Sequence, residues 1–128
     1  MTSSTSTPID YANLPTPPKA VADFCLIPIG TPTPSVSKEV AAVQRLMKAS
    51  GLSYSMHSAG TTVEGTWDQV MRLIGQAHTL VHQNGVLRVQ TDIRAGTRTD
   101  KAQRFEEKVR KVESLLAEEG EGEKEGRD

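Results

Sequence analysis

The order of hydrophobic patterns over residues 19–117 is the feature that most constrains how this chain can fold. Residues 20–29 form an apolar run that ends at Pro28 and Gly30, which predicts a buried strand. Segments with helical periodicity and short extended segments then follow one another. The predicted order is strand, helix, strand, strand, helix, strand, helix.

The first helical segment is predicted over residues 35–50, and Ser35 or Ser37 can cap its start. Gly51 stands where a left-handed residue would end the helix. Apolar side chains recur on one helical face at Val36, Val40, Val43 and Met47.

Two short extended pieces, residues 52–58 and 61–64, flank the turn signal Ala59-Gly60 and predict a hairpin. Residues 66–69 (TWDQ) match the capping box that opens a helix. This second helix is predicted to end at Asn84-Gly85. One of its faces carries Trp67, Val70, Met71, Ile74, His78 and Val81.

The last predicted strand covers residues 86–94 and alternates in character, with Val89 and Thr91 on one side and Arg88 and Gln90 on the other. A polar loop over residues 95–99 leads to a third helix from about Asp100. The apolar seam of that helix is Phe105, Val109, Val112 and Leu116.

Two split βαβ units with right-handed crossovers give an α+β fold of the ferredoxin-like sandwich type. We expect a four-stranded antiparallel sheet with helices on one face, plus a C-terminal helix. The other sheet face carries apolar side chains of the first strand. An exposed apolar face usually has a partner, so we expect oligomerisation through the sheet, the third helix or both.

Composition divides the chain into three parts. Residues 1–18 are mostly Ser, Thr and Pro, and residues 118–128 are mostly Glu, Gly and Lys. Neither end has enough apolar surface to offset the entropy of ordering, so both are predicted to be disordered tails. The folded domain is predicted to span residues 19–117.

Charge and cysteine content exclude several classes of protein. The net charge of -1 gives no field that would attract nucleic acid or an anionic membrane. The single cysteine, Cys25, rules out a disulfide within the chain and is predicted to be a small buried hydrophobe. No membrane span or targeting signal is recognised, which favours a cytoplasmic protein.

Known catalytic and binding motifs are missing. His78 and His82 have helical spacing, but no Glu follows the first histidine, so no metal site is predicted. His57 can line a pocket or be a packed, hydrogen-bonded histidine. RNA-binding sheets stack bases on aromatic side chains. None of the five aromatic residues lies in the last strand, so RNA binding is not predicted. No nucleophile–base pair and no nucleophile elbow is recognised, so an enzyme is not predicted either.

Residues 60–65 (GTTVEG) are the stretch with the most chemical character, because two hydroxyls and a carboxylate lie on one short strand. Burying a carboxylate on a central strand is costly without a partner. From spacing alone, Glu64 is either a functional group in a site or an exposed side chain on an edge strand.

Several short pieces, in this order and spacing, resemble the small thiamine-binding protein family (YkoF-like), in its fungal branch. The resemblance runs from about Asp23 to Val112. The pieces are residues 28–30 (PIG), 35–37 with 40–41, 51–54 (GLSY), 60–65, 88–94 (RVQTDIR) and 98–101 (RTDK).

The resemblance implies a ferredoxin-like fold, a homotetramer built as a dimer of dimers, and binding of thiamine or hydroxymethylpyrimidine without turnover. Thiamine is then a ligand and not a cofactor. Glu64 can bond a ring nitrogen and the threonines can accept from the exocyclic amine. The ligand-binding residues it implies are Ser37, Thr61, Thr62, Glu64 and Thr91. Tyr54 or Met56 can pack against a ring of such a ligand.

Two departures from the family pattern concern the loop after the last strand and the chain ends. Family members often carry carboxylates in that loop, where this chain has Ala95-Gly96. The Ser/Thr/Pro-rich start and the acidic end are not part of the pattern. A structural or protein-interaction module with no small-molecule ligand is therefore the alternative function.

Overall fold

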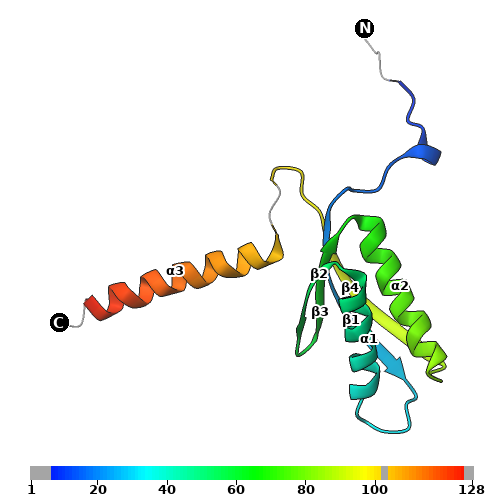
Figure 1. Ribbon diagram of the computed structural model, residues 1–128. Coiled ribbons are helices and arrows are strands. Elements are labelled where there is room, and N and C mark those ends of the chain that lie inside the picture. Colours follow the sequence, from blue (N-terminus) through cyan, green and yellow to red (C-terminus); the bar gives the residue numbers. More distant parts are fainter. Residues whose placement is uncertain (1–6, 102–103, 126–128) are drawn as a thin grey trace.

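The computed structural model describes residues 7–101 and 104–125, and it forms one four-stranded sheet with three α-helices (Figure 1). The elements are, in chain order, a 3-10 turn (Tyr11–Asn13), β1 (Ala20–Ile29), α1 (Ser37–Ser50), β2 (Ser53–His57), β3 (Gly60–Gly65), α2 (Trp67–Gln83), β4 (Arg88–Gly96) and α3 (Phe105–Glu125).

The sheet has the strand order β2-β3-β1-β4, and every neighbouring pair is antiparallel. Helices α1 and α2 lie on one face of this sheet, and α3 points away from it (Figure 1). This arrangement confirms the predicted ferredoxin-like sandwich with an additional C-terminal helix. None of the described helices is long and apolar enough to cross a membrane.

The core lies between the sheet and the two helices. The sheet contributes Ala22, Phe24 and Val63, all nearly inaccessible to solvent. The helices contribute Val43 and Met47 from α1 and Val70, Leu73, Ile74, Ala77 and Val81 from α2. Because residues paired across an antiparallel ladder share a face, the pairs Ala22↔Val63 and Phe24↔Thr61 define the helix-covered face.

The same register places the alternate residues on the open face, away from α1 and α2. There Asp23 pairs with Thr62 and Val21 pairs with Glu64. Cys25 belongs to this set and is only half-buried. The prediction that Cys25 is a buried hydrophobe is therefore wrong, because odd-numbered residues of β1 point away from the helices.

The ends of α1 and α2 follow the sequence signals in three of four cases, and α2 ends as predicted with Asn84 as its C-cap. Thr66 and Gln69 form the predicted capping box at the start of α2, and Gly51 ends α1 in a left-handed conformation with φ 75°. At the start of α1, however, the N-cap residue is Val36, whose side chain makes no cap hydrogen bond. Neither Ser35 nor Ser37 is the N-cap residue, although the Ser35 hydroxyl accepts from the Ser37 N–H at 3.4 Å and lies 3.0 Å from the Ser37 hydroxyl.

The two ends of the described chain differ in their contacts. Near the N-terminus, the Trp67 N–H donates to the Pro17 carbonyl at 3.2 Å, and the Thr16 hydroxyl donates to the Asp68 carboxylate at 2.9 Å. At the other end, α3 continues through residues 118–125. The predicted tails, residues 1–18 and 118–128, and the predicted domain, residues 19–117, stay predictions.

Candidate functional site

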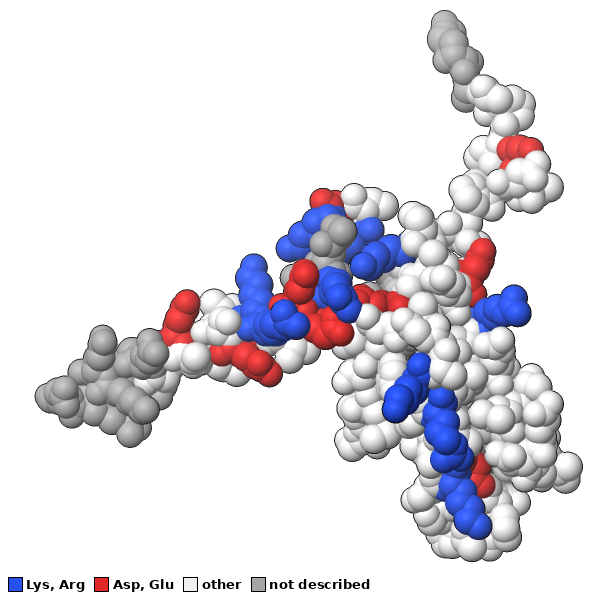
Figure 2. Space-filling model, viewed as in Figure 1, with Lys and Arg blue, Asp and Glu red and all other residues white. Residues whose placement is uncertain are grey.

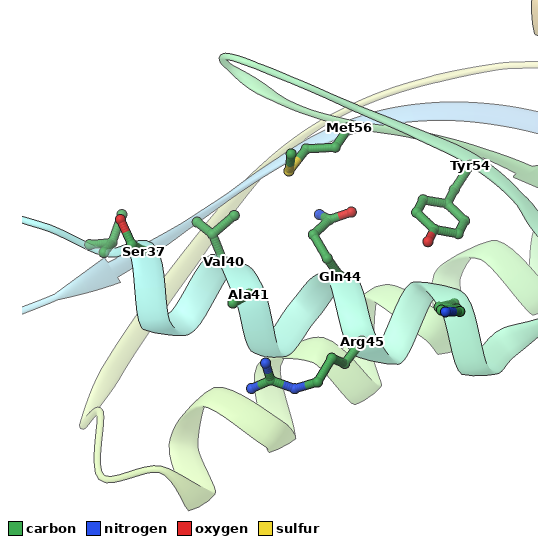
Figure 3. Close-up of a pocket in the computed structure, with 9 residues that line it drawn as sticks. Ser37, Val40, Ala41, Gln44, Arg45, Tyr54 and Met56 are labelled. Atoms are coloured by element: carbon green, nitrogen blue, oxygen red, sulfur yellow. The ribbon is translucent and has the colours of Figure 1, made fainter.

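A groove of about 580 Å³ lies between α1 and β2, which is an edge strand of the sheet. It is closed on one side by α1 and on the other by two side chains of β2 (Figure 3). Its lining consists of Val36, Ser37, Val40, Ala41, Gln44, Arg45, Lys48, Tyr54 and Met56.

Strand register and helical spacing bring these side chains together. Tyr54 pairs with Val63 and Met56 pairs with Thr61, so both β2 side chains are on the helix-covered face. On α1, residues 37, 40, 44 and 48 lie three or four apart and therefore share one face. Figure 3 shows Val40 and Gln44 directed from α1 toward the strand that carries Met56 and Tyr54.

The apolar face predicted for the first helix is divided between the core and the groove. Val43 and Met47 are buried in the core as expected. Val36 and Val40 instead line the groove, and Val40 is exposed. Within the part of the chain that the structure describes, no strand lies beyond β2 to cover the helix at this edge. The N-terminal half of α1 therefore leaves apolar surface open to solvent.

The floor of the groove contains one polar contact. The Gln44 amide donates to the Thr61 hydroxyl at 2.9 Å, and Thr61 is 4% exposed. The amide oxygen of Gln44 lies on the side toward Tyr54 (Figure 3). Arg45 points to the opposite side of α1 (Figure 3), so its charge lies at the margin of the groove. The groove thus offers an apolar surface, an aromatic ring and a neutral acceptor.

Glu64 is on the other face of the sheet, 5% exposed, and its carboxylate is fully engaged by the start of α3. One oxygen accepts from Arg104 Nε at 3.1 Å and the other from the Phe105 N–H at 3.2 Å. Arg104 also donates to Ser53 and contacts Glu106. The hydrogen bond that Arg104 donates to Glu64 is the main cause that raises the pKa of Arg104.

The interpretation of Glu64 as an exposed side chain on an edge strand is therefore wrong. Strand β3 lies inside the sheet, and the carboxylate is buried with partners that satisfy it. Within the described residues, these partners come from the first turn of α3 and its preceding residue. The visible role of Glu64 is to hold the start of α3 against the open face of the sheet.

The remaining predicted ligands lie in other places. Thr62 is on the open face, opposite Asp23. Thr91 is on β4, at the far edge of the sheet, and its hydroxyl lies 2.5 Å from His78 Nε2 of α2. The six residues do not converge on one pocket. Ser37 and Tyr54 line the groove, Thr61 contacts it through Gln44, and Thr62, Glu64 and Thr91 are outside it.

The histidines have separate partners. His57 Nε2 lies 2.8 Å from the Asp23 carboxylate on the open face, and His82 Nδ1 lies 2.8 Å from the Val86 carbonyl. His57 thus has a hydrogen-bond partner, although its side chain is exposed. In the part of the chain that the structure describes, no three His, Cys, Asp or Glu side chains are placed to hold a metal ion.

Sequence reasoning missed Gln44 and Arg104. Gln44 lies seven residues after Ser37, which is two helical turns, so the same spacing argument that found Val40 could have found it. Arg104 gave no comparable signal, because its partner Glu64 is 40 residues away in the sequence.

Comparison with known proteins connects this geometry to a family. The sequence profile of the family described as "Thiamine-binding protein" matches residues 22–113. The chain belongs to the thiamine-binding protein family. The matched range contains every groove-lining residue as well as Glu64 and Arg104. The resemblance that the sequence motifs indicated is thereby confirmed.

Individual relatives agree with this membership. The UPF0045 protein ECM15 of Eremothecium gossypii is 47% identical over 97 residues, covering 76% of this chain and 92% of the relative. A UPF0045 protein of Synechocystis is 41% identical over 96 residues, covering 75% of this chain and 78% of its own.

Solved structures share the fold. The hypothetical protein MJ1052 from Methanocaldococcus jannaschii superposes with a TM-score of 0.66 at 30% identity, over 74% of this chain and 96% of that one. A Thermotoga maritima protein, provisionally assigned to thiamine biosynthesis or salvage, superposes with a TM-score of 0.64 at 19% identity. The match covers 74% of this chain and 99% of the Thermotoga chain. At that identity, the second likeness shows the fold alone.

Replacing Arg104 by Gln should loosen the start of α3, because the buried Glu64 carboxylate loses its charged partner. We expect faster hydrogen exchange at the Phe105 amide and its α3 neighbours, with little change in α2. Arg110→Gln, an exposed substitution on the same helix, is the matched control. Unchanged exchange at Phe105 would show that Glu64 does not hold this helix.

His78 should make stability depend on pH. Burial, and secondarily His82, lowers its pKa below the usual 6.5. The unfolded chain then takes up the proton first, so stability falls as the pH drops through 6.5 and levels off below the folded pKa. Urea unfolding at about pH 7.5 and about pH 5.5 should show a smaller difference for His78→Gln than for the parent. An equal pH dependence in both proteins would remove His78 as the cause.

Proposed function

We propose that this protein binds thiamine, or its hydroxymethylpyrimidine moiety, in the groove between α1 and β2, without chemical turnover. The observation that carries the proposal is that the family match covers a groove combining an aromatic side chain with a part-buried amide–hydroxyl pair. Its volume of about 580 Å³ lies in the range typical of small-molecule sites.

The chemistry of the groove suits an aminopyrimidine ring. Tyr54 and Met56 offer a flat aromatic surface and a polarisable thioether against which a heterocycle can pack. The exocyclic amine of the pyrimidine is a donor, and the Gln44 amide oxygen is an acceptor on the Tyr54 side of the groove (Figure 3). The Ser37 hydroxyl can donate to or accept from the ligand.

The positive charge at the margin of the groove affects the two rings of thiamine differently. Arg45 and Lys48 are at the margin of the groove, and none of the described residues that line it is a carboxylate. A cationic thiazolium gains nothing from this field, whereas the neutral pyrimidine is not opposed by it. We therefore expect hydroxymethylpyrimidine to bind at least as tightly as thiamine.

A different hypothesis places the ligand outside the groove, against Thr62, Glu64 or Thr91. Such a site would lie on the open face or beneath α2. Glu64 would then have to exchange its hydrogen bonds with Arg104 and the Phe105 N–H for bonds to the ligand. This cost makes the groove the better-supported site. The two hypotheses predict different sensitive residues and can be separated by substitution.

Calorimetric titration with thiamine and hydroxymethylpyrimidine tests the function. We expect Tyr54→Leu and Gln44→Ala each to weaken binding by about tenfold, the usual effect of losing one good contact. Thr62→Val, on the opposite face of the neighbouring strand, is the matched control. Loss of binding in Thr62→Val and Glu64→Gln, but not in Tyr54→Leu, would move the site to the open face. No heat with either ligand would reject the function.

The apolar seam of α3 supports the homotetramer that the family resemblance implies. Val109, Val112, Leu115 and Leu116 are 50–59% exposed, which is unusual for a row of large apolar side chains. A second copy of the chain is the partner we propose for this seam. The dimer-of-dimers arrangement and a cytoplasmic location stay predictions.

Light scattering coupled to size-exclusion chromatography checks the assembly. The parent should have four times the mass of the chain, and Val112→Glu should reduce it, because a carboxylate in an apolar interface is costly. Lys111→Glu, next to it on the helix, should leave the mass unchanged. A monomeric parent would instead favour the alternative function, in which the α3 seam binds another protein.

A further inference from the structure

A second hollow, of about 920 Å³, lies where the N-terminal segment, the end of β4 and the start of α3 meet. Residues 15–21 form one wall, residues 94–99 form another, and Lys101 and Lys108 complete the margin. We call this the basic hollow. It shares no lining residue with the groove between α1 and β2.

The side chains around the basic hollow carry a surplus of positive charge. Among the described lining residues there is one carboxylate, Asp23, against the five cations Lys19, Arg94, Arg98, Lys101 and Lys108. Asp23 is already bonded to His57, and Arg98 is bonded to Asp100. Figure 2 shows Lys and Arg side chains, with carboxylates among them, gathered over the loop after β4 and the first turns of α3.

Three of these cations have no carboxylate partner. Within residues 7–101 and 104–125, Lys19, Arg94 and Lys108 make no ion pair. They come from three separate parts of the chain and converge on one hollow. Like charges brought together in this way repel one another, so an anion that enters between them is stabilised by all three.

Apart from the hydroxyls of Thr16, Thr97 and Thr99, the rest of the lining is mainly apolar. Pro15, Pro17 and Pro18 form one wall together with Ala20 and Val21 of β1. The Pro17 carbonyl accepts from the Trp67 N–H, and Thr16 bonds Asp68, so this wall is attached to the start of α2. Proline restricts the backbone further. The basic hollow thus combines a constrained apolar wall with a cationic margin.

We propose that the basic hollow binds a small organic phosphate, with its ring against the proline wall and its phosphate among Lys19, Arg94 and Lys108. Guanidinium and ammonium groups are the usual phosphate ligands in proteins. The volume fits one small molecule. The net charge of -1 argues against a nucleic-acid surface. The inference does not depend on thiamine binding.

Titration of the full-length protein with phenyl phosphate, inorganic phosphate and phenol tests the proposal. Phenyl phosphate should bind more tightly than either fragment, and added salt should weaken it. Lys19→Gln and Arg94→Gln should each weaken its binding by about tenfold, as expected for one charge-assisted hydrogen bond. Arg72→Gln, an exposed arginine on α2 outside both hollows, should have no effect.

Four outcomes would overturn the proposal. The first is no binding of phenyl phosphate at millimolar concentration, and the second is equally tight binding of inorganic phosphate. The third is a loss of affinity in Arg72→Gln as large as that in Arg94→Gln, which would mean diffuse attraction by surface charge. The fourth concerns a peptide. Tighter binding of a Glu-rich peptide than of phenyl phosphate would assign the basic hollow to an acidic protein segment. Circular dichroism of each variant checks that the fold is kept.

Discussion

The pairing of β1 with both β3 and β4 decides the chemistry of this molecule. Because β1 lies inside the sheet, its register fixes which side chains of its neighbours face the helices and which face away. On β3 this sends Thr61 toward α1 and the adjacent Thr62 to the open face. A shift of one residue would exchange these faces and bring Glu64 into the core.

That division gives the two faces of the sheet different tasks. The helix-covered face holds a dry core at its centre and, at the β2 edge, a groove with a neutral polar floor. The open face holds the ion pair of Glu64 with Arg104 and the hydrogen bond between His57 and Asp23. Buried carboxylates are tolerated only with partners. The position of α3 therefore depends on a residue of β3.

The fold could be predicted from sequence because it depends on local signals that repeat over several residues. The alternation of strand and helix patterns, the capping box at Thr66 and the αL residue Gly51 were sufficient. Periodicity identifies the apolar face of a helix but not what covers it. It placed Val40 on the same face as Val43 and Met47 but could not show that Val40 lines the groove while the other two are buried in the core. The partner of Glu64 lay beyond any local pattern, 40 residues away.

The structure separates the six predicted ligand residues, because sequence proximity does not determine which face of the sheet a side chain occupies. Thr61, Thr62 and Glu64 are neighbours in sequence, and nearness along a strand suggests a single site. The period of two residues in a strand contradicts this, since consecutive side chains point to opposite faces. Ser37, Tyr54 and Thr61 come from three elements and meet only through tertiary packing. In a sheet protein of this kind, residues i and i+2 on paired strands are better candidates for one site than residues i and i+1.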